Sequence, residues 1–155
     1  MHVAKLMDRI YHRIRHRDAQ LIADAATEDT DLATLAEHDY CLVATYKQDG
    51  TAVPTPVWFA IGDGQLYFRT AADAPKIKRI RATPTVRLAA CDARGRPLHK
   101  PLKAISGVAR ILDADETATA EASLGAKYGR KRAMYTAAFG GASAYVAVCP
   151  VQPPA

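Results

Sequence analysis

The sequence predicts a mainly β domain, a β-barrel of six short antiparallel strands with flanking helices. From residue 40 onward, short apolar and β-branched segments alternate with turn-forming residues. Asp49-Gly50 separates two such segments, and an Asp-Gly pair in this position is typical of a tight hairpin. Helical patterns fill the longer connections. A closed or nearly closed barrel suits such strands, because closure removes the exposed edges at which chains aggregate.

The six strands follow from the turn residues along the chain. Gly62-Asp63-Gly64 marks a second tight turn, so the first three strands are expected to form a meander. A short helix, a loop with glycine and proline, and a longer helical region separate the remaining strands. The predicted strands span residues 41–46, 51–61, 65–70, 85–91, 103–112 and 144–149.

Helices are predicted in the connections between the strands. Thr30 is a candidate cap for the first of them, and Pro84 stops the second. Asp113 and Glu116 have the spacing of a capping box, and Gly129 suits the end of the helix that they open. The predicted helical segments span residues 31–38, 75–81 and 113–128, with a further piece that ends at Gly140-Gly141.

Residues 1–30 are predicted to form an amphipathic helical extension, and residues 31–155 the barrel domain. Within the extension, apolar residues recur at helical spacing over 2–26, with arginines between them. We expect this apolar stripe to dock on the protein itself or on a second subunit. An anionic membrane surface is the alternative, but the segment has few of the large aromatic side chains that anchor interfacial helices.

Positive charge is concentrated in the middle of the chain. The formal net charge is +5, and residues 69–103 contain ten basic residues against two acidic ones. Proteins that bind single-stranded nucleic acid place aromatic side chains among such cations. After Arg69 this stretch contains no Phe, Trp or Tyr, so we expect no nucleic-acid partner.

The cysteines and the apolar segments predict a cytoplasmic protein. The three cysteines, Cys41, Cys91 and Cys149, lie in apolar runs without C-x-x-C spacing, and we expect them to be reduced and buried. No run of 18 apolar residues is present, and the first residues do not resemble a secretory signal.

A metal site is not expected. His12 and His16 stand four residues apart, but no cysteine or carboxylate set lies near them to complete a site. A solvated basic face explains them better. The dinucleotide, Walker and nucleophile-elbow motifs are also absent.

Two prolines make one predicted strand unusual. Pro54 and Pro56 donate no hydrogen bond to a sheet, so the backbone near Thr55 and Val57 is expected to face an edge, a bend or a ligand. An edge strand at the barrel rim is the purely structural interpretation.

A candidate anion site follows the third predicted strand. Arg69 and Thr70 end this strand, and a short basic helix begins within a few residues. A hydroxyl, several cations and a helix N-terminus so close together suit an anion such as a phosphate. A solvated basic helix explains the same residues equally well. The cations on the helix are Lys76, Lys78, Arg79 and Arg81.

Five segments, taken in order, resemble a known family. They are Leu42-Val-Ala-Thr-Tyr-Lys-Gln-Asp-Gly-Thr51, Val53-Pro-Thr-Pro-Val-Trp-Phe59, Leu66-Tyr-Phe-Arg-Thr70, Lys76-Ile-Lys-Arg-Ile80 and Pro84-Thr-Val-Arg-Leu88. The series resembles the FMN-binding split β-barrel superfamily, the fold of pyridoxamine 5′-phosphate oxidase, and most of all its actinobacterial branch that uses the deazaflavin coenzyme F-420. The resemblance covers residues 31–149 and implies a six-stranded antiparallel split β-barrel.

The resemblance also implies roles for individual residues. Thr70, Lys76 and Lys78 match the hydroxyl and cations that hold the cofactor phosphate. Beyond the resemblance, we name Arg69 and Arg79 as second choices, which would meet an anionic tail of the cofactor. Members of the superfamily are homodimers with the cofactor in the subunit groove. The substrate residues of the oxidase itself are not recognisable here. The residues that match the strand along the cofactor ring are Pro54, Thr55, Pro56, Val57 and Trp58.

Two classes of function follow as hypotheses. The first is an oxidoreductase in which reduced coenzyme F-420, or alternatively FMN, passes hydride to a small organic substrate. No acid–base pair stands out in the sequence, which agrees with a reaction whose chemistry resides in the cofactor. The second is a non-catalytic protein that binds a flavin, a deazaflavin or a tetrapyrrole in the same groove.

Overall fold

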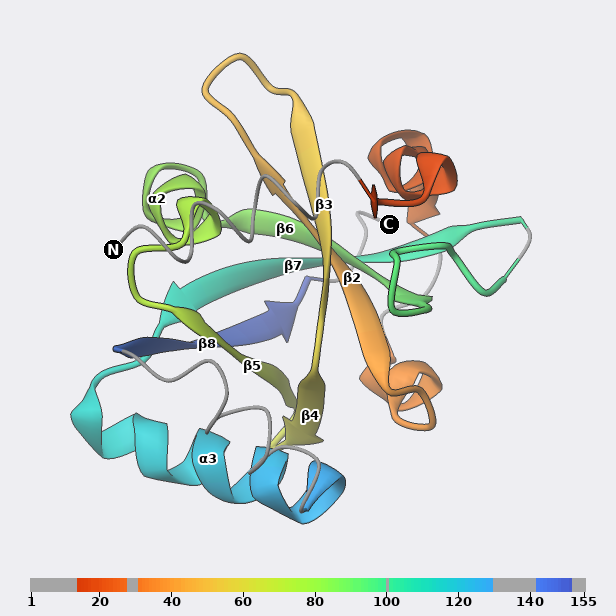
Figure 1. Cartoon of the computed structure of the whole chain (residues 1–155). Helices are drawn as coiled ribbons and strands as arrows, with labels where there is room; N and C mark the ends of the chain where they lie inside the picture. Colours follow the sequence, from red (N-terminus) through yellow and green to blue (C-terminus); the bar gives the residue numbers. More distant parts are fainter. Residues whose placement is uncertain (1–13, 28–30, 100, 130–141, 152–155) are drawn as a thin grey trace.

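The computed structural model describes residues 14–27, 31–99, 101–129 and 142–151. It consists mainly of one antiparallel sheet that curls into a half-barrel, which confirms the predicted fold class (Figure 1). The strands are β1 (Ala26–Thr27), β2 (Tyr40–Tyr46), β3 (Ala52–Val57), β4 (Phe59–Gly62), β5 (Gln65–Ala71), β6 (Thr85–Cys91), β7 (Lys103–Ile111) and β8 (Ser143–Pro150). The helices are the 3-10 helices η1 (Arg17–Asp24) and η2 (Leu32–Leu35) and the α-helices α2 (Pro75–Ala82) and α3 (Ala114–Tyr128).

The strand order explains how the barrel is split. The sheet runs β3-β2-β6-β7-β8-β5-β4, and the short β1 pairs in parallel with β7. The two outermost strands, β3 and β4, are therefore consecutive in the chain and are joined by Trp58. The predictions of one strand over 51–61 and of six strands in total are wrong. The first half of this segment pairs with β2 and the second half with β5, so it cannot remain one strand.

The two prolines lie on an edge, as one interpretation of the sequence expected. Pro54 is opposite Ala44 and Pro56 is opposite Leu42, both on β2. Within the described residues β3 has β2 as its one neighbour in the sheet. An edge strand tolerates proline, because half of its backbone N–H groups point away from the sheet.

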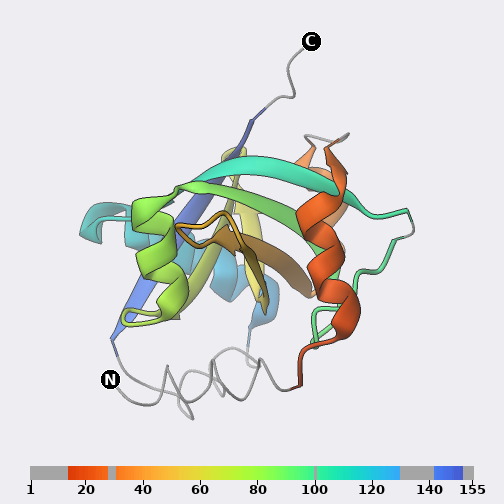
Figure 2. The same ribbon diagram turned by 90° about the horizontal axis from the view of Figure 1, so that it is seen from above.

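The core fills the concave side of the sheet. Its largest side chains are those of Phe59 and Phe68, which are fully buried. Helix α2 covers this core with Ile77 and Ile80. On the convex side η1 packs with Ile22 against the sheet, so that η1 and α2 lie on opposite sides of it (Figure 2).

The N-terminal segment differs from its prediction. Residues 2–13 of the predicted helix over 2–26 lie outside the described residues. The prediction of one continuous helix is wrong at His16. This residue has an extended backbone, and its ring accepts a hydrogen bond from the Asp18 N–H. This contact opens η1 as a separate 3-10 helix, and its buried residues Ala19 and Ile22 attach it to the barrel.

Other helix ends agree with the sequence in part. Asp113 accepts a hydrogen bond from the Glu116 N–H, and α3 ends at Gly129 with φ +55°, as predicted. The helix over 31–38 is only the four-residue η2, and Asp31 caps it, since its carboxylate accepts from Ala33. Thr30 and the helical piece near 140 lie outside the described residues.

The cysteines are not all buried. Cys41 and Cys91 are buried, but Cys149 is exposed, so that prediction is wrong for one of the three. An apolar run does not determine which face of the sheet each of its residues occupies. Cys149 lies near the end of β8 and is exposed there. Burial raises the pKa of the Cys41 thiol to about 12, which keeps it protonated at neutral pH. None of the described helices is long and apolar enough to cross a membrane.

Candidate functional site

The predicted ring platform follows the outer edge of β3. Pro54, Thr55 and Val57 are buried, whereas Pro56 and Trp58 are half-buried. A flat ring placed along this edge would therefore meet Pro56 and Trp58 first.

A polar connection runs from this strand to α2. The Arg79 Nε donates to the hydroxyl of Thr45 at 2.7 Å, and this hydroxyl donates to the Val53 carbonyl at 3.4 Å. Thr45 is fully buried. On β3 itself, the Thr55 Oγ1 is buried and has no hydrogen-bond partner among the described residues. A buried hydroxyl without a partner is costly, and a bound ligand is one way to satisfy it.

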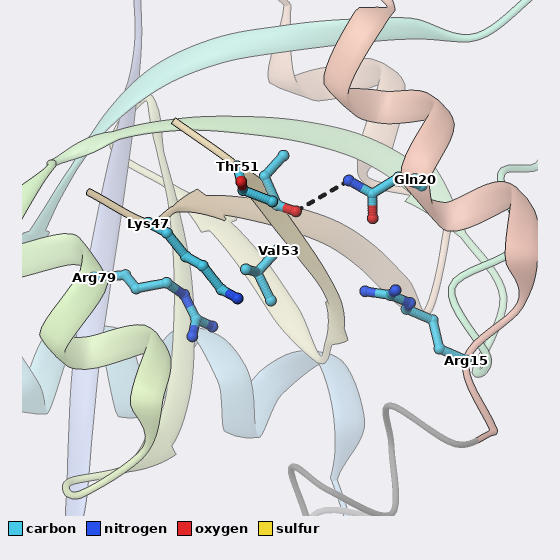
Figure 3. A pocket seen from close by; sticks show the side chains of 7 residues that line it. Arg15, Gln20, Lys47, Thr51, Val53 and Arg79 are labelled. Atoms are coloured by element: carbon cyan, nitrogen blue, oxygen red, sulfur yellow. Dashed lines mark hydrogen bonds between the residues drawn. The ribbon is translucent and has the colours of Figure 1, made fainter. Parts of the chain in front are cut away.

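A surface pocket of about 350 Å³ lies alongside β3, between α2 and η1 (Figure 3). Arg79 and Lys47 reach into it from one side and Arg15 from the other. Its lining residues are Arg15, Gln20, Lys47, Thr51, Ala52, Val53 and Arg79. Three of the seven are cations and none is an acid, so the pocket has a positive potential.

The residues predicted to hold a phosphate lie around the start of α2. Arg69 and Thr70 stand near the end of β5, and a hydrogen bond from Ala74 to Ala71 closes the turn that leads into the helix. Ala74 precedes α2, and its side chain cannot accept a hydrogen bond from the first N–H groups of the helix. The Arg69 Nε donates to Ser143 on β8 at 2.7 Å.

The two predicted lysine anchors do not share a face of α2. Lys76 and Arg79 are three residues apart and half-buried, which places them on one side of the helix. Lys78 is exposed and two residues from Lys76, so it points to another side. The geometry favours Lys76 and Arg79 over Lys78. Their role as phosphate anchors stays a prediction.

The residues that support the break between β3 and β4 were not predicted from the sequence. The Tyr128 ring stacks on Trp58 with centroids 4.8 Å apart, and its hydroxyl lies 2.7 Å from both the N–H and the carbonyl of Phe59. The amine of Lys127 lies 3.4 Å over the Phe59 ring and donates to the His38 carbonyl. Tyr128 continues the i, i+4 series of buried residues on α3, a pattern that marks it as core-facing.

Lys127 should make stability depend on pH. Partial burial is the main cause that lowers its pKa from 10.5 to about 8, and Asp39 opposes the shift. Between pH 8 and 10.5 the unfolded chain binds more protons at this position than the folded chain does. The free energy of unfolding should therefore gain a contribution that rises with pH across this window. Lys127→Met should remove this rise, which urea denaturation at pH 7.5, 9 and 10.5 would measure.

The exposed Lys103 provides the control for this experiment. Lys103→Met should keep the pH dependence of the wild-type protein. If Lys127→Met and the wild type show the same dependence, the pKa of Lys127 is not lowered in the folded protein.

Comparisons with known proteins agree with the fold. A family model described as pyridoxamine 5′-phosphate oxidase matches residues 27–147. A search of curated proteins finds no match. Seventy chains of solved structures match.

Three of these structures illustrate the different ligands and activities that are named for proteins of this fold. The heme storage protein HutZ from Vibrio cholerae is 14% identical with a TM-score of 0.60, covering 76% of this chain and 84% of its own. An FAD-binding protein from Mesorhizobium loti is 16% identical with a TM-score of 0.56, covering 77% and 84%. An F420 reductase is 20% identical with a TM-score of 0.50, covering 81% and 97%. At these identities the likeness shows a common fold.

Proposed function

Since the chain belongs to the pyridoxamine 5′-phosphate oxidase family, we propose that it is an oxidoreductase that uses reduced coenzyme F-420 to transfer hydride to a small organic substrate. FMN is the alternative cofactor. The observation that carries the proposal is the set of cations on α2, of which Arg79 also lines the pocket beside β3. Between residues 69 and 81 the chain has five basic residues against one acid, Asp73.

The residues present fit a phosphate-bearing ring cofactor. Thr70, Lys76 and the first turn of α2 would hold the phosphate through charge-assisted hydrogen bonds. Pro56 and Trp58 would support one face of the ring, and the buried Thr55 hydroxyl is available as a hydrogen-bond partner. The bound cofactor supplies the hydride chemistry, while the chain binds it, orients it and excludes water from its ring.

The choice of the deazaflavin over FMN rests on charge. The pocket adds Arg15 and Lys47 to the cations of α2, which suits a cofactor with an acidic tail better than one with a phosphate alone. The match to an F420 reductase, over 97% of that chain, supports the same choice. We also propose a homodimer with the cofactor in the subunit groove, in which a second copy would cover the edge of β3.

Removing the phosphate anchor should weaken cofactor binding. Fluorescence titration should give micromolar or tighter binding of coenzyme F-420 to the wild-type protein, and weaker binding of FMN. Lys76→Ala should weaken F-420 binding by about ten- to a hundredfold, because a charge-assisted hydrogen bond is lost. Lys78→Ala should have a smaller effect, since Lys78 points to another side of α2. Added salt should weaken binding as well.

The exposed Lys103 again serves as the matched control, and Lys103→Ala should titrate like the wild type. Tight retention of FMN with no response to added F-420 would overturn the choice of cofactor. If Lys76→Ala and Lys78→Ala both titrate like the wild type, the phosphate is held elsewhere.

A binding protein without catalysis is the second candidate, favoured by the similarity to the heme storage protein HutZ. Titration with heme distinguishes a heme-binding protein from the proposed oxidoreductase. Tight heme binding, together with no binding of either F-420 or FMN, would support storage or transport over redox catalysis.

A further inference from the structure

The pocket beside β3 draws its cations from three separate parts of the chain. Arg15 precedes η1, Lys47 lies in the β2–β3 hairpin, and Arg79 belongs to α2. Figure 3 shows all three side chains directed toward the same hollow. Arg15 is 32 or more residues from the other two, so local sequence does not explain this convergence.

Hydrogen bonds fix the walls of the pocket. The backbone on both sides of Arg15 is bound to Arg94, since the His16 N–H donates to the Arg94 carbonyl and the Arg94 Nε donates to the Ile14 carbonyl. The Gln20 amide donates to the Ala52 carbonyl at 3.0 Å and joins η1 to β3. Because these hydrogen bonds already fix the pocket walls, less conformational entropy is lost when an anion binds.

The Arg79 side chain is fixed as well. Its Nε is bound to the buried Thr45, which holds the guanidinium beside the pocket. The hairpin turn carries one acid, Asp49, whose carboxylate accepts from the Thr51 N–H and which is not among the lining residues. A bound anion in this hollow would lie near all three cations at once.

We propose that Arg15, Lys47 and Arg79 form a second anion site, which binds carboxylate or phosphate groups beyond those held at the start of α2. Its volume of about 350 Å³ admits a small polyanion. Arg79 is one helical turn from Lys76, so the site adjoins the proposed phosphate anchor. The assignment of the anion to a cofactor or a substrate rests on the proposed function. The acidic tail of the cofactor and an anionic substrate are the two sources of such an anion, and they share the same chemistry.

The test uses citrate, a compact tricarboxylate, in calorimetric titrations of the full-length protein without cofactor. Arg15→Gln/Lys47→Gln should weaken citrate binding at least about tenfold, because two charge-assisted contacts are lost. Arg17→Gln/Lys103→Gln removes the same charge from exposed positions outside the pocket and should stay within about twofold of the wild type. Lys47→Gln alone, at an exposed hairpin position, should weaken citrate binding by a smaller factor. It tests the site even if the double variant does not fold.

A second set of titrations identifies the source of the anion. If the acidic tail of the cofactor occupies the site, saturation with coenzyme F-420 should abolish citrate binding and saturation with FMN should not. If a substrate occupies it, citrate should bind in the presence of either cofactor.

Two results would overturn the proposal: no citrate binding to the wild type, or equal losses in the pocket variant and its charge-matched control. Citrate binding that depends on Arg15 and Lys47, in a protein that binds neither F-420 nor FMN, would preserve the anion site and refute the proposed cofactor.

Discussion

Tyr128→Ala is expected to lower the free energy of unfolding by about 3–5 kcal/mol, the cost of removing a large buried aromatic side chain. The substitution removes the stack on Trp58, where the two rings lie 4.8 Å apart at 12°. It also removes the hydroxyl that satisfies the Phe59 backbone and donates to the Asp39 carbonyl. Urea denaturation followed by the fluorescence of Trp58, the one tryptophan in the chain, measures the effect.

Two further variants separate the ring from its hydroxyl. Tyr128→Phe keeps the stack but leaves the buried Phe59 N–H without its partner, at a cost of about 1–3 kcal/mol. Tyr46→Phe changes a half-buried tyrosine at the end of β2 and should cost less than about 0.5 kcal/mol. Should Tyr128→Phe prove as stable as the wild type, the hydroxyl does not hold the break between β3 and β4.

Arg87→Met is expected to cost about 2–3 kcal/mol and to loosen η1 from the barrel. The guanidinium of Arg87 on β6 donates to the carbonyls of Ile22, Ala23 and Ala25, where η1 ends. These contacts add hydrogen bonds at the end of η1, where helix carbonyls lack internal partners, and the Ile22 carbonyl also accepts from the Ala25 N–H. Hydrogen exchange over residues 17–25 should become faster, and the melting temperature should fall.

Arg96→Met is the matched control for Arg87. Arg96 forms an exposed ion pair with Asp92, and such pairs contribute about 0–1 kcal/mol. Unchanged exchange over residues 17–25 in Arg87→Met would mean that Ala19 and Ile22 hold η1 without help from the guanidinium.

Local patterns in the sequence were enough to predict most of the elements. The hairpin at Asp49-Gly50, the capping of α3 by Asp113 and its end at Gly129 depend on residues close together in the chain. The edge position of Pro54 and Pro56 follows from the missing N–H of proline alone.

What the sequence did not predict depends on contacts between distant residues. The segment 51–61 divides at Trp58 because its first half pairs with β2 and its second half pairs with β5. These two strands lie near opposite ends of the sheet. The meeting of Arg15 with Lys47 and Arg79 depends on hydrogen bonds to Arg94, which is 80 residues from Ile14. No periodicity in a single segment contains that information.

The pairing of β8 has a consequence for the order in which the chain folds. Strand β8 lies between β5 and β7, and it joins Ser143 to Arg69, 74 residues earlier. The hairpins β2–β3 and β4–β5 close short loops and form early, whereas contacts over such a separation carry a larger entropic cost and form late. During synthesis the two hairpins leave the ribosome well before β8. Until β8 inserts, β5 and β7 each present an unpaired edge, so this interval is when the nascent chain is most open to aggregation.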